Sequence, residues 1–316
     1  MHGARAFFFV CAGLLCLLPA TVTAQAPSFV RMWGSFGTGD DQFKTPVGVA
    51  VDRAGNVFTI DTNNNRVQVF TTGGAFLRKW GSLGHGAGQF LGPVSIALDP
   101  NGILYVADGP EHGVQKFTAT GTRLGTWGVG ISNIAADPMG FFYAAGFWFG
   151  VEFHSTFGKF NSDGWLQASW PYVGAPNGLA VDAAGNVYAA DDFNERMTKY
   201  SSSGQVLAQW GSLGYGHIGE LWQPVRVAVD AAGVVYVVDY ENCRVLAFTS
   251  GGVLLTQWGS AGSGPGQFAN PVGIAVDADG YIYVADTNNS RIQVFTPILA
   301  TPSQRTSWGR LKGLYR

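Results

Sequence analysis

Short apolar runs alternate with polar, turn-forming clusters along most of the chain. The first clear set has apolar runs over residues 47–51, 57–60 and 66–70, separated by clusters rich in Asp, Asn and Gly. A glycine pair then precedes a fourth run, which ends at Trp80. Short runs of β-branched and aromatic residues between turn residues predict four strands joined by tight turns, rather than helices.

The same set of four runs recurs along the chain, as in a repeat protein. An aspartate marks the first turn of each copy, and successive aspartates lie 47, 38, 45, 48 and 47 residues apart. Four short strands in each of six copies predict an all-β fold, a six-bladed β-propeller of four-stranded blades. The six marker positions are Asp52, Asp99, Asp137, Asp182, Asp230 and Asp277.

The fourth run usually carries a tryptophan, and one such run stands alone near the N-terminus. Its Trp33 lies 19 residues before the first marker aspartate, the same spacing that separates Trp80 from the second. We therefore predict that residues 28–35 form the outer strand of the last blade and close the ring. Trp308 is the competing candidate for that position, and residues 297–316 are otherwise expected to form a tail.

The first 24 residues differ in composition from the repeats. Arg5 precedes an apolar run over residues 6–18. This run is too short to cross a bilayer core about 30 Å thick. A small-residue site ends at Ala24, so residues 1–24 are typical of a secretory signal peptide. We predict cleavage near Ala24, a secreted or periplasmic location, a propeller over residues 25–296 and no membrane span.

Charge and cysteine content exclude several classes of protein. The chain has 19 basic and 21 acidic residues, and only 13% of its residues are charged. This balance gives no basic surface for DNA or RNA, so we expect no nucleic-acid partner. Cys243 is the one cysteine outside the signal peptide, so we expect no internal disulfide. We also expect a monomer that packing holds together.

Four copies share a motif, Asp-x-x-Asn-x-Arg, directly after the second strand. With Pro-x-Gly-x-Ala-x-Asp before it and GQF-x-x-P after it, this motif resembles the NHL repeat of six-bladed TolB-like propellers, over residues 28–296. The repeated Asp and Arg flank a tight turn and can pair across it, so we interpret them as structural. The motif occupies residues 61–66, 191–196, 239–244 and 286–291.

The resemblance implies either a binding platform or an enzyme. In the peptidylglycine amidating lyase, a propeller of this class, histidines after the blade-opening proline hold zinc. The matching positions here carry no histidine, so the resemblance does not imply lyase activity, and we expect no cofactor and no metal. These positions are Val47, Val94, Ser132, Asn177, Val225 and Val272.

Four histidines follow residue 24, and the repeat register places them in loops of four different sectors. No two of them have the spacing of metal ligands. We therefore interpret them as solvated loop residues, with a metal site assembled across blades as the alternative. They are His85, His112, His154 and His217.

Departures from the repeat identify the candidate site, because function is usually added where a regular scaffold becomes irregular. In the third blade, the loop after the second strand is five residues longer than elsewhere and is rich in aromatic residues. The connections on either side of this blade are short, with 10 and 12 residues between the tryptophan and the next marker aspartate. We predict ligand-binding residues in this loop, namely Trp148, Phe149, Phe153 and His154.

The innermost strands add a polar group near the mouth of the central channel. Asn133, Asn177 and Arg226 stand where other copies have small or apolar residues. We therefore predict an exported module that binds a protein, glycan or small molecule through the sector of blades 2–4. The alternative is an enzyme, a lyase or hydrolase with or without a metal, whose site lies at the channel mouth.

Overall fold

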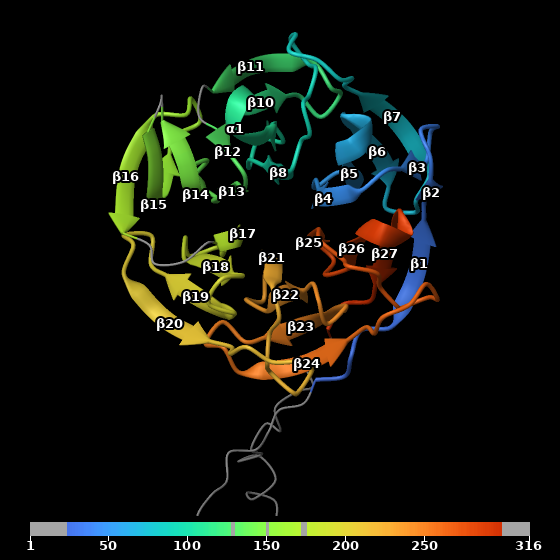
Figure 1. Ribbon diagram of the computed structural model, residues 1–316, viewed down its shortest axis with the longest axis vertical. Helices are drawn as coiled ribbons and strands as arrows, with labels where there is room; N and C mark the ends of the chain where they lie inside the picture. Colours follow the sequence, from blue (N-terminus) through green and yellow to red (C-terminus); the bar gives the residue numbers. More distant parts are fainter. Residues whose placement is uncertain (1–23, 128–129, 150–151, 172–175, 299–316) are drawn as a thin grey trace, which may run out of the picture.

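Six antiparallel β-sheets surround a central axis in the computed structural model of the chain (Figure 1). The structure describes residues 24–127, 130–149, 152–171 and 176–298. Each sheet forms one blade, and its strands follow one another between the axis and the rim. The predicted fold class, an all-β six-bladed propeller of four-stranded blades, is confirmed.

The blades are numbered along the chain. Blade 1 contains β4 (Pro46–Val51), β5 (Asn56–Asp61), β6 (Arg66–Thr71) and β7 (Phe76–Trp80); blade 2 contains β8 (Ser95–Leu98), β9 (Leu104–Ala107), β10 (Val114–Phe117) and β11 (Arg123–Trp127). Blade 3 contains β12 (Gly130–Ile131), β13 (Ala135–Ala136), β14 (Phe142–Phe149), β15 (Glu152–Phe160) and β16 (Leu166–Pro171).

The second half of the ring follows the same order. Blade 4 contains β17 (Pro176–Val181), β18 (Val187–Asp191), β19 (Arg196–Tyr200) and β20 (Val206–Trp210); blade 5 contains β21 (Pro224–Val229), β22 (Val235–Asp239), β23 (Arg244–Phe248) and β24 (Leu254–Trp258). Blade 6 contains β25 (Ile274–Val276), β26 (Ile282–Asp286), β27 (Arg291–Phe295) and β1 (Phe29–Trp33). Short elements in the loops are β2 (Ser35–Phe36), β3 (Gln42–Phe43), α1 (Gly109–His112), η1 (Thr62–Asn64) and η2 (Thr287–Asn289).

The N-terminal strand closes the ring, as predicted. β1 pairs antiparallel with β27, and Trp33 lies opposite Ile292. Figure 1 shows the blue β1 beside the red β27 at the rim of the ring. The competing Trp308 and residues 1–23, most of the predicted signal peptide, lie outside the described residues.

The first turn of each blade is closed by its marker aspartate. In blade 1, Asp52 Oδ1 accepts hydrogen bonds from the backbone nitrogens of Ala54 at 2.9 Å and Asn56 at 2.8 Å. Gly55 has a φ of 80° in this turn, a conformation that glycine adopts without steric cost. The Asp and Gly of the repeat therefore fix the hairpin between the two inner strands.

The outer-strand tryptophans join neighbouring blades. Trp33 is 8% exposed, and its ring centroid lies 5.7 Å from that of Phe70 in blade 1. A Cβ atom added to Gly74 would lie 2.8 Å from the Trp33 ring. Because this distance is too short for a real contact, the turn between the two outer strands requires glycine here. The same contact recurs between later blades, with Trp80 on Gly121 and Trp127 on Gly164.

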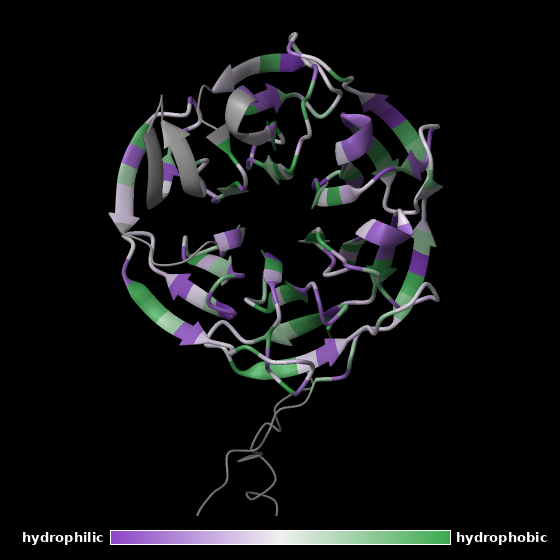
Figure 2. Cartoon of the chain, in the orientation of Figure 1, coloured by the Kyte–Doolittle hydropathy of each residue, from purple (hydrophilic) through white to green (hydrophobic). Residues whose placement is uncertain are grey.

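Burial follows the position of a strand in its blade. The residues of β22 and β23, in the middle of blade 5, are all buried, whereas β7 at the rim alternates between exposed and partly buried residues. Figure 2 shows hydrophilic segments on the strands of the rim. In the described part of the chain, no helix has the length and apolar character needed to cross a membrane.

Candidate functional site

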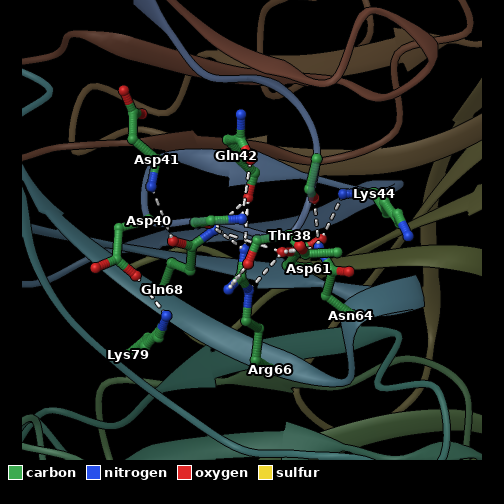
Figure 3. Close-up of polar contacts among 12 residues, drawn as sticks. Thr38, Asp40, Asp41, Gln42, Lys44, Asp61, Asn64, Arg66, Gln68 and Lys79 are labelled. Carbon is green, nitrogen blue, oxygen red and sulfur yellow. Dashed lines mark hydrogen bonds and ion pairs between the residues drawn. The ribbon is translucent and has the colours of Figure 1, made fainter.

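In blades 1, 5 and 6, the Asp-x-x-Asn-x-Arg motif forms a buried ion pair that holds the hairpin against the loop before it. In blade 1, Asp61 Oδ2 accepts hydrogen bonds from Arg66 Nε at 2.7 Å and from Asn64 Nδ2 at 2.8 Å (Figure 3). The Asp61 side chain is fully buried, and that of Arg66 is 7% exposed. The other guanidinium nitrogens donate to backbone oxygens of the preceding loop, those of Thr38, Gly39 and Gln42.

The ion pair is not equally tight in every blade. Blades 5 and 6 repeat it, with Nε–Oδ2 distances of 2.8 and 2.7 Å. In blade 4, Arg196 Nε lies 3.9 Å from Asp191 Oδ2, and the Arg196 side chain is 33% exposed. Because these charges brace strands and loops against each other, the geometry fits the structural interpretation of the motif.

Arg226 on β21 crosses the central channel. Its guanidinium donates to the backbone oxygens of Val225 and of Val94, both at 3.0 Å, and to that of Asn177. Val94 belongs to blade 2, which lies opposite blade 5 in the ring. Asn133 Nδ2 donates to the same Asn177 oxygen at 2.5 Å. Burial lowers the pKa of Arg226 to about 10, so the guanidinium is charged at neutral pH.

The three predicted channel residues therefore lie together, and the Arg226 side chain spans the channel. Beside them remains a cavity of about 50 Å³ to which all six blades contribute. Since one water molecule takes about 30 Å³ of liquid volume, this cavity has room for water but not for an organic ligand. A ligand at the mouth of the channel would lie above these side chains rather than between them.

Asp192 borders the same network and was not predicted from the sequence. Asn177 Nδ2 donates to Asp192 Oδ2, while Oδ1 is buried and has no hydrogen-bond partner among the described residues. Burial raises the pKa of Asp192, although the Asn177 hydrogen bond and the charge of Arg226 oppose the rise. The sequence could have indicated Asp192, because it replaces a threonine of the repeat. At the same position, blades 1 and 6 have Thr62 and Thr287, whose hydroxyls donate hydrogen bonds to backbone oxygens of the next blade.

Blade 3 has a longer hairpin than the other blades. Gly146 stands at the repeat position of Asp61, where the pairing of β5 with β6 ends. In blade 3, β14 and β15 continue for three further residue pairs, the last of which joins Phe149 and Glu152. The insertion that was predicted to be a loop is therefore β-structure, and β12 pairs with its β14 side.

The four predicted aromatic-site residues all lie on this hairpin. Trp148 and Phe149 belong to β14, and Phe153 and His154 belong to β15. Trp148 lies opposite Phe153 in the register of the two strands. The side chains of these four residues lie outside the described part of the structure.

Two of the four histidines lie in contact, whereas the sequence pattern predicted that all four are separate. His112 Nε2 lies 2.7 Å from His85 Nδ1. His217 is exposed in the loop before blade 5, and the side chain of His154 lies outside the described residues. Within the described residues, no group of three or more His, Cys, Asp or Glu side chains could hold a metal ion.

A larger opening lies on the opposite face, where turns join the first and second strands of each blade. The turns of blades 1, 2 and 3 line a cavity of about 460 Å³ there. Three marker aspartates are among the lining residues, but each carboxylate caps its own turn. The exposed Arg53 adds a cation to this rim. The repeat pattern gave no indication of this cavity, because its lining residues are ordinary turn residues.

The profile of the NHL repeat matches residues 43–70, 221–248 and 268–295. These three segments are NHL repeats, and they lie in a six-bladed propeller. The matched repeats lie in blades 1, 5 and 6, which are the blades with the three short Asp–Arg pairs. The resemblance that the sequence motif carried is therefore confirmed.

Solved structures share the propeller fold of this chain at low sequence identity. A protein of unknown function from Bacteroides thetaiotaomicron VPI-5482 is 19% identical, with a TM-score of 0.68 and coverage of 86% of this chain and 76% of that one. Virginiamycin B lyase from Staphylococcus aureus is 14% identical, with a TM-score of 0.53 and coverage of 79% and 80%. A luciferin-regenerating enzyme is 13% identical, with a TM-score of 0.61 and coverage of 86% and 96%. No curated protein matches the sequence.

Proposed function

We propose that this propeller is an exported binding module that recognises a protein, glycan or small molecule through the sector of blades 2–4. The observation that carries the proposal is the hairpin of blade 3, whose strands β14 and β15 pair for three residues beyond the end of the equivalent strands in blade 1. In blades 1, 4, 5 and 6 the second strand ends at the aspartate of the repeat motif, so this hairpin is the longest departure from the pattern. Binding sites on repeat scaffolds usually lie at such departures.

The neighbouring connections favour access to this hairpin. Seven residues separate β11 from β13, the innermost strand of blade 3, whereas 14 residues separate β7 from β8. A short connection next to a lengthened hairpin leaves less chain that could cover the hairpin from the blade 2 side. Aromatic residues dominate the binding energy of many interfaces, because they bury a large apolar area with few rotatable bonds. The apolar N-terminal run of 13 residues supports export.

We expect the double variant Trp148→Ala/Phe149→Ala to lose ligand binding while its melting temperature changes little. Removal of two binding anchors is expected to weaken affinity by about 2 kcal/mol or more. The measurement is a thermal-shift screen of arrayed glycans, peptides and small metabolites, followed by calorimetry of each compound that stabilises the wild-type protein. Phe36→Ala is the matched control, because Phe36 is an aromatic residue that is 73% exposed in the loop before blade 1.

Three results would contradict this proposal. Compounds that still bind the double variant would show that the hairpin is not the site. Compounds that lose binding in Arg53→Ala but not in the double variant would place the site at the 460 Å³ cavity on the opposite face. A large loss of stability in the double variant with binding retained would show that the aromatic residues pack within the protein.

One observation favours the enzyme alternative, with Asp192 at the channel mouth as its acid–base group. Its Oδ1 is buried without a hydrogen-bond partner among the described residues, and burial raises its pKa. A carboxyl group with a raised pKa beside a cationic Arg226 is typical of catalytic sites as well as of structural networks. Turnover of lactone or ester substrates that is abolished in Asp192→Asn would favour the enzyme over the binding module.

The raised pKa of Asp192 also predicts a pH-dependent effect on stability. Because the folded-state pKa lies above the unfolded value, the charged carboxylate destabilises the folded protein at pH 7, and this penalty disappears as the pH falls toward about 4. We therefore expect Asp192→Asn to raise the melting temperature at pH 7 and to change it little at pH 4. Asp279→Asn, an exposed turn residue, is the control and should show no such difference. An Asp192→Asn variant that is destabilised at pH 7 would contradict the argument.

A further inference from the structure

Blade 2 keeps the aspartate of the repeat motif but not its arginine. Asp108 stands at the position of Asp61, and Gly113 stands at the position of Arg66. The Asp108 side chain is fully buried, and its oxygens accept hydrogen bonds from the backbone nitrogen of Leu91 at 2.9 and 3.1 Å. A buried carboxylate without its guanidinium needs another donor, because an unpaired buried charge is strongly destabilising.

His112 supplies that donor. Its Nδ1 lies 3.0 Å from Asp108 Oδ2, and its Nε2 lies 2.7 Å from Nδ1 of His85. Since a carboxylate only accepts hydrogen bonds, the His112 proton is on Nδ1, and Nε2 of the neutral ring presents a lone pair toward His85. A buried carboxylate that fixes the tautomer of a histidine and orients its free nitrogen outward is the arrangement found behind many metal-ligating histidines.

From this geometry we propose that His85 and His112 form a binding site for a divalent cation of the zinc class, with Asp108 as the residue that orients His112. The ligands are His112 Nε2 and His85 Nδ1, and the proton of His85 moves to its Nε2 when the ion binds. The imidazole donors select Zn²⁺ and related transition metals over Mg²⁺ and Ca²⁺, which prefer oxygen ligands. Water completes the coordination sphere.

The site requires only a small opening. Two Zn–N bonds of about 2.0–2.1 Å at a tetrahedral angle separate the nitrogens by about 3.3 Å. The nitrogens now lie 2.7 Å apart, so the rings must separate by several tenths of an ångström. His85 is exposed in the loop before blade 2, and it moves more easily than His112, whose side chain is only 13% exposed and is held by Asp108. The same exposure gives an ion direct access from solvent.

This proposal is independent of what the blade 3 hairpin binds. The two histidines lie on the face where hairpins join the second and third strands of each blade. His85 belongs to the connection between blades 1 and 2, and His112 belongs to α1, between β9 and β10. Two protein ligands leave two coordination positions to water. A ligand bound over blades 2–4 can reach these positions, but the ion itself needs only the histidine pair.

The test is a Zn²⁺ titration of the purified protein, produced without a polyhistidine tag. We expect one Zn²⁺ per chain by calorimetry and equilibrium dialysis, together with shifts of the His85 and His112 imidazole resonances in ¹H–¹⁵N spectra. His85→Ala and His112→Ala should each weaken binding by about 10-fold or more, and Asp108→Asn should weaken it through the lost orientation of His112. His217→Ala is the matched control, because His217 is an exposed loop histidine, and it should bind Zn²⁺ like the wild type.

The result that would overturn the proposal is an absence of saturable Zn²⁺ binding, or binding that His85→Ala leaves unchanged. His85→Ala is the decisive variant, because it keeps the Asp108–His112 contact that braces blade 2. If His112→Ala fails to fold, the His85→Ala titration and the imidazole resonances still decide the outcome. Binding that is lost only in His217→Ala would place the ion in the loop before blade 5 and would also overturn the proposal.

Discussion

A variant lacking residues 25–35 is expected to yield little soluble, folded protein. The deletion removes β1, which pairs with β27 and supplies the outer strand of blade 6. It also removes Trp33, which is 8% exposed and packs against Phe70 of blade 1 at a centroid distance of 5.7 Å. The edge of β27 would then be exposed to pairing with other chains, which favours aggregation.

The expected loss is large because β1 joins the two ends of the ring. Arg31 Nη1 donates to the backbone oxygen of Thr72 at 2.7 Å, so the strand holds blade 1 as well as blade 6. A propeller without this contact has to keep its first and last blades together through the inner strands and the hydrogen bond from Thr287 to the Pro46 oxygen. Such non-local contacts form late in folding and are lost together.

Soluble yield and thermal unfolding followed by circular dichroism are the measurements. A variant lacking residues 299–316, which removes Trp308, is the matched control and should melt like the full chain. Unchanged melting after the N-terminal deletion, together with failure of the C-terminal deletion, would show that the segment around Trp308 closes the ring instead.

The blades and their closure could be predicted from the sequence because the signals are local. Each first turn needs an aspartate and a glycine within four residues, as in Asp52 and Gly55, and each outer strand needs a tryptophan that packs on a glycine of the next blade. These requirements recur at fixed spacing, so they remain visible even where one copy is incomplete. The spacing of Trp33 identified the closing strand in this way.

The contact between His85 and His112 was missed, although a spacing rule would have found it. The loop before each blade folds over the hairpin of that blade, and the contacts recur at 27 residues: Asn64 to Gly37 in blade 1, and Arg291 to Gly264 in blade 6. His112 and His85 are also 27 residues apart. The repeat register placed these histidines in separate loops. It did not show that the loop before a blade contacts the hairpin of that same blade.

The path of Arg226 could not be predicted from the repeat. The pattern places Arg226 at a position where the chain has Gly48, Gly178 and Gly273 in other blades. Its long side chain uses the space beside these glycines and reaches Val94 across the axis. A Cβ atom on Gly178 would lie 2.6 Å from the Cα atom of Arg226, so the path depends on small neighbours in three dimensions and not on local spacing.

Asp61→Ala is expected to destabilise the propeller more than Asp191→Ala, although both remove the same motif residue. Asp61 lies 2.7 Å from an arginine whose side chain is 7% exposed, so its loss leaves a buried unpaired guanidinium, which costs about 3–5 kcal/mol. In blade 4 the distance is 3.9 Å and the Arg196 side chain is 33% exposed. Water reaches part of the Arg196 guanidinium, although its Nε atom is buried, so we expect about 1–3 kcal/mol for Asp191→Ala.

The midpoints of urea denaturation measure this difference, and the double variant Asp61→Ala/Arg66→Met separates its causes. Removal of both charges eliminates the unpaired guanidinium, so the double variant should be more stable than Asp61→Ala alone. The recovery should be partial, because Arg66 also donates to the backbone oxygens of Thr38, Gly39 and Gln42, and these acceptors lose their donor.

Equal destabilisation by Asp61→Ala and Asp191→Ala would contradict the argument from burial, since the two pairs differ mainly in distance and exposure. Loss of ligand binding in a well-folded Asp191→Ala variant would contradict the structural interpretation of the motif itself, because a brace between strand and loop has no direct part in recognition.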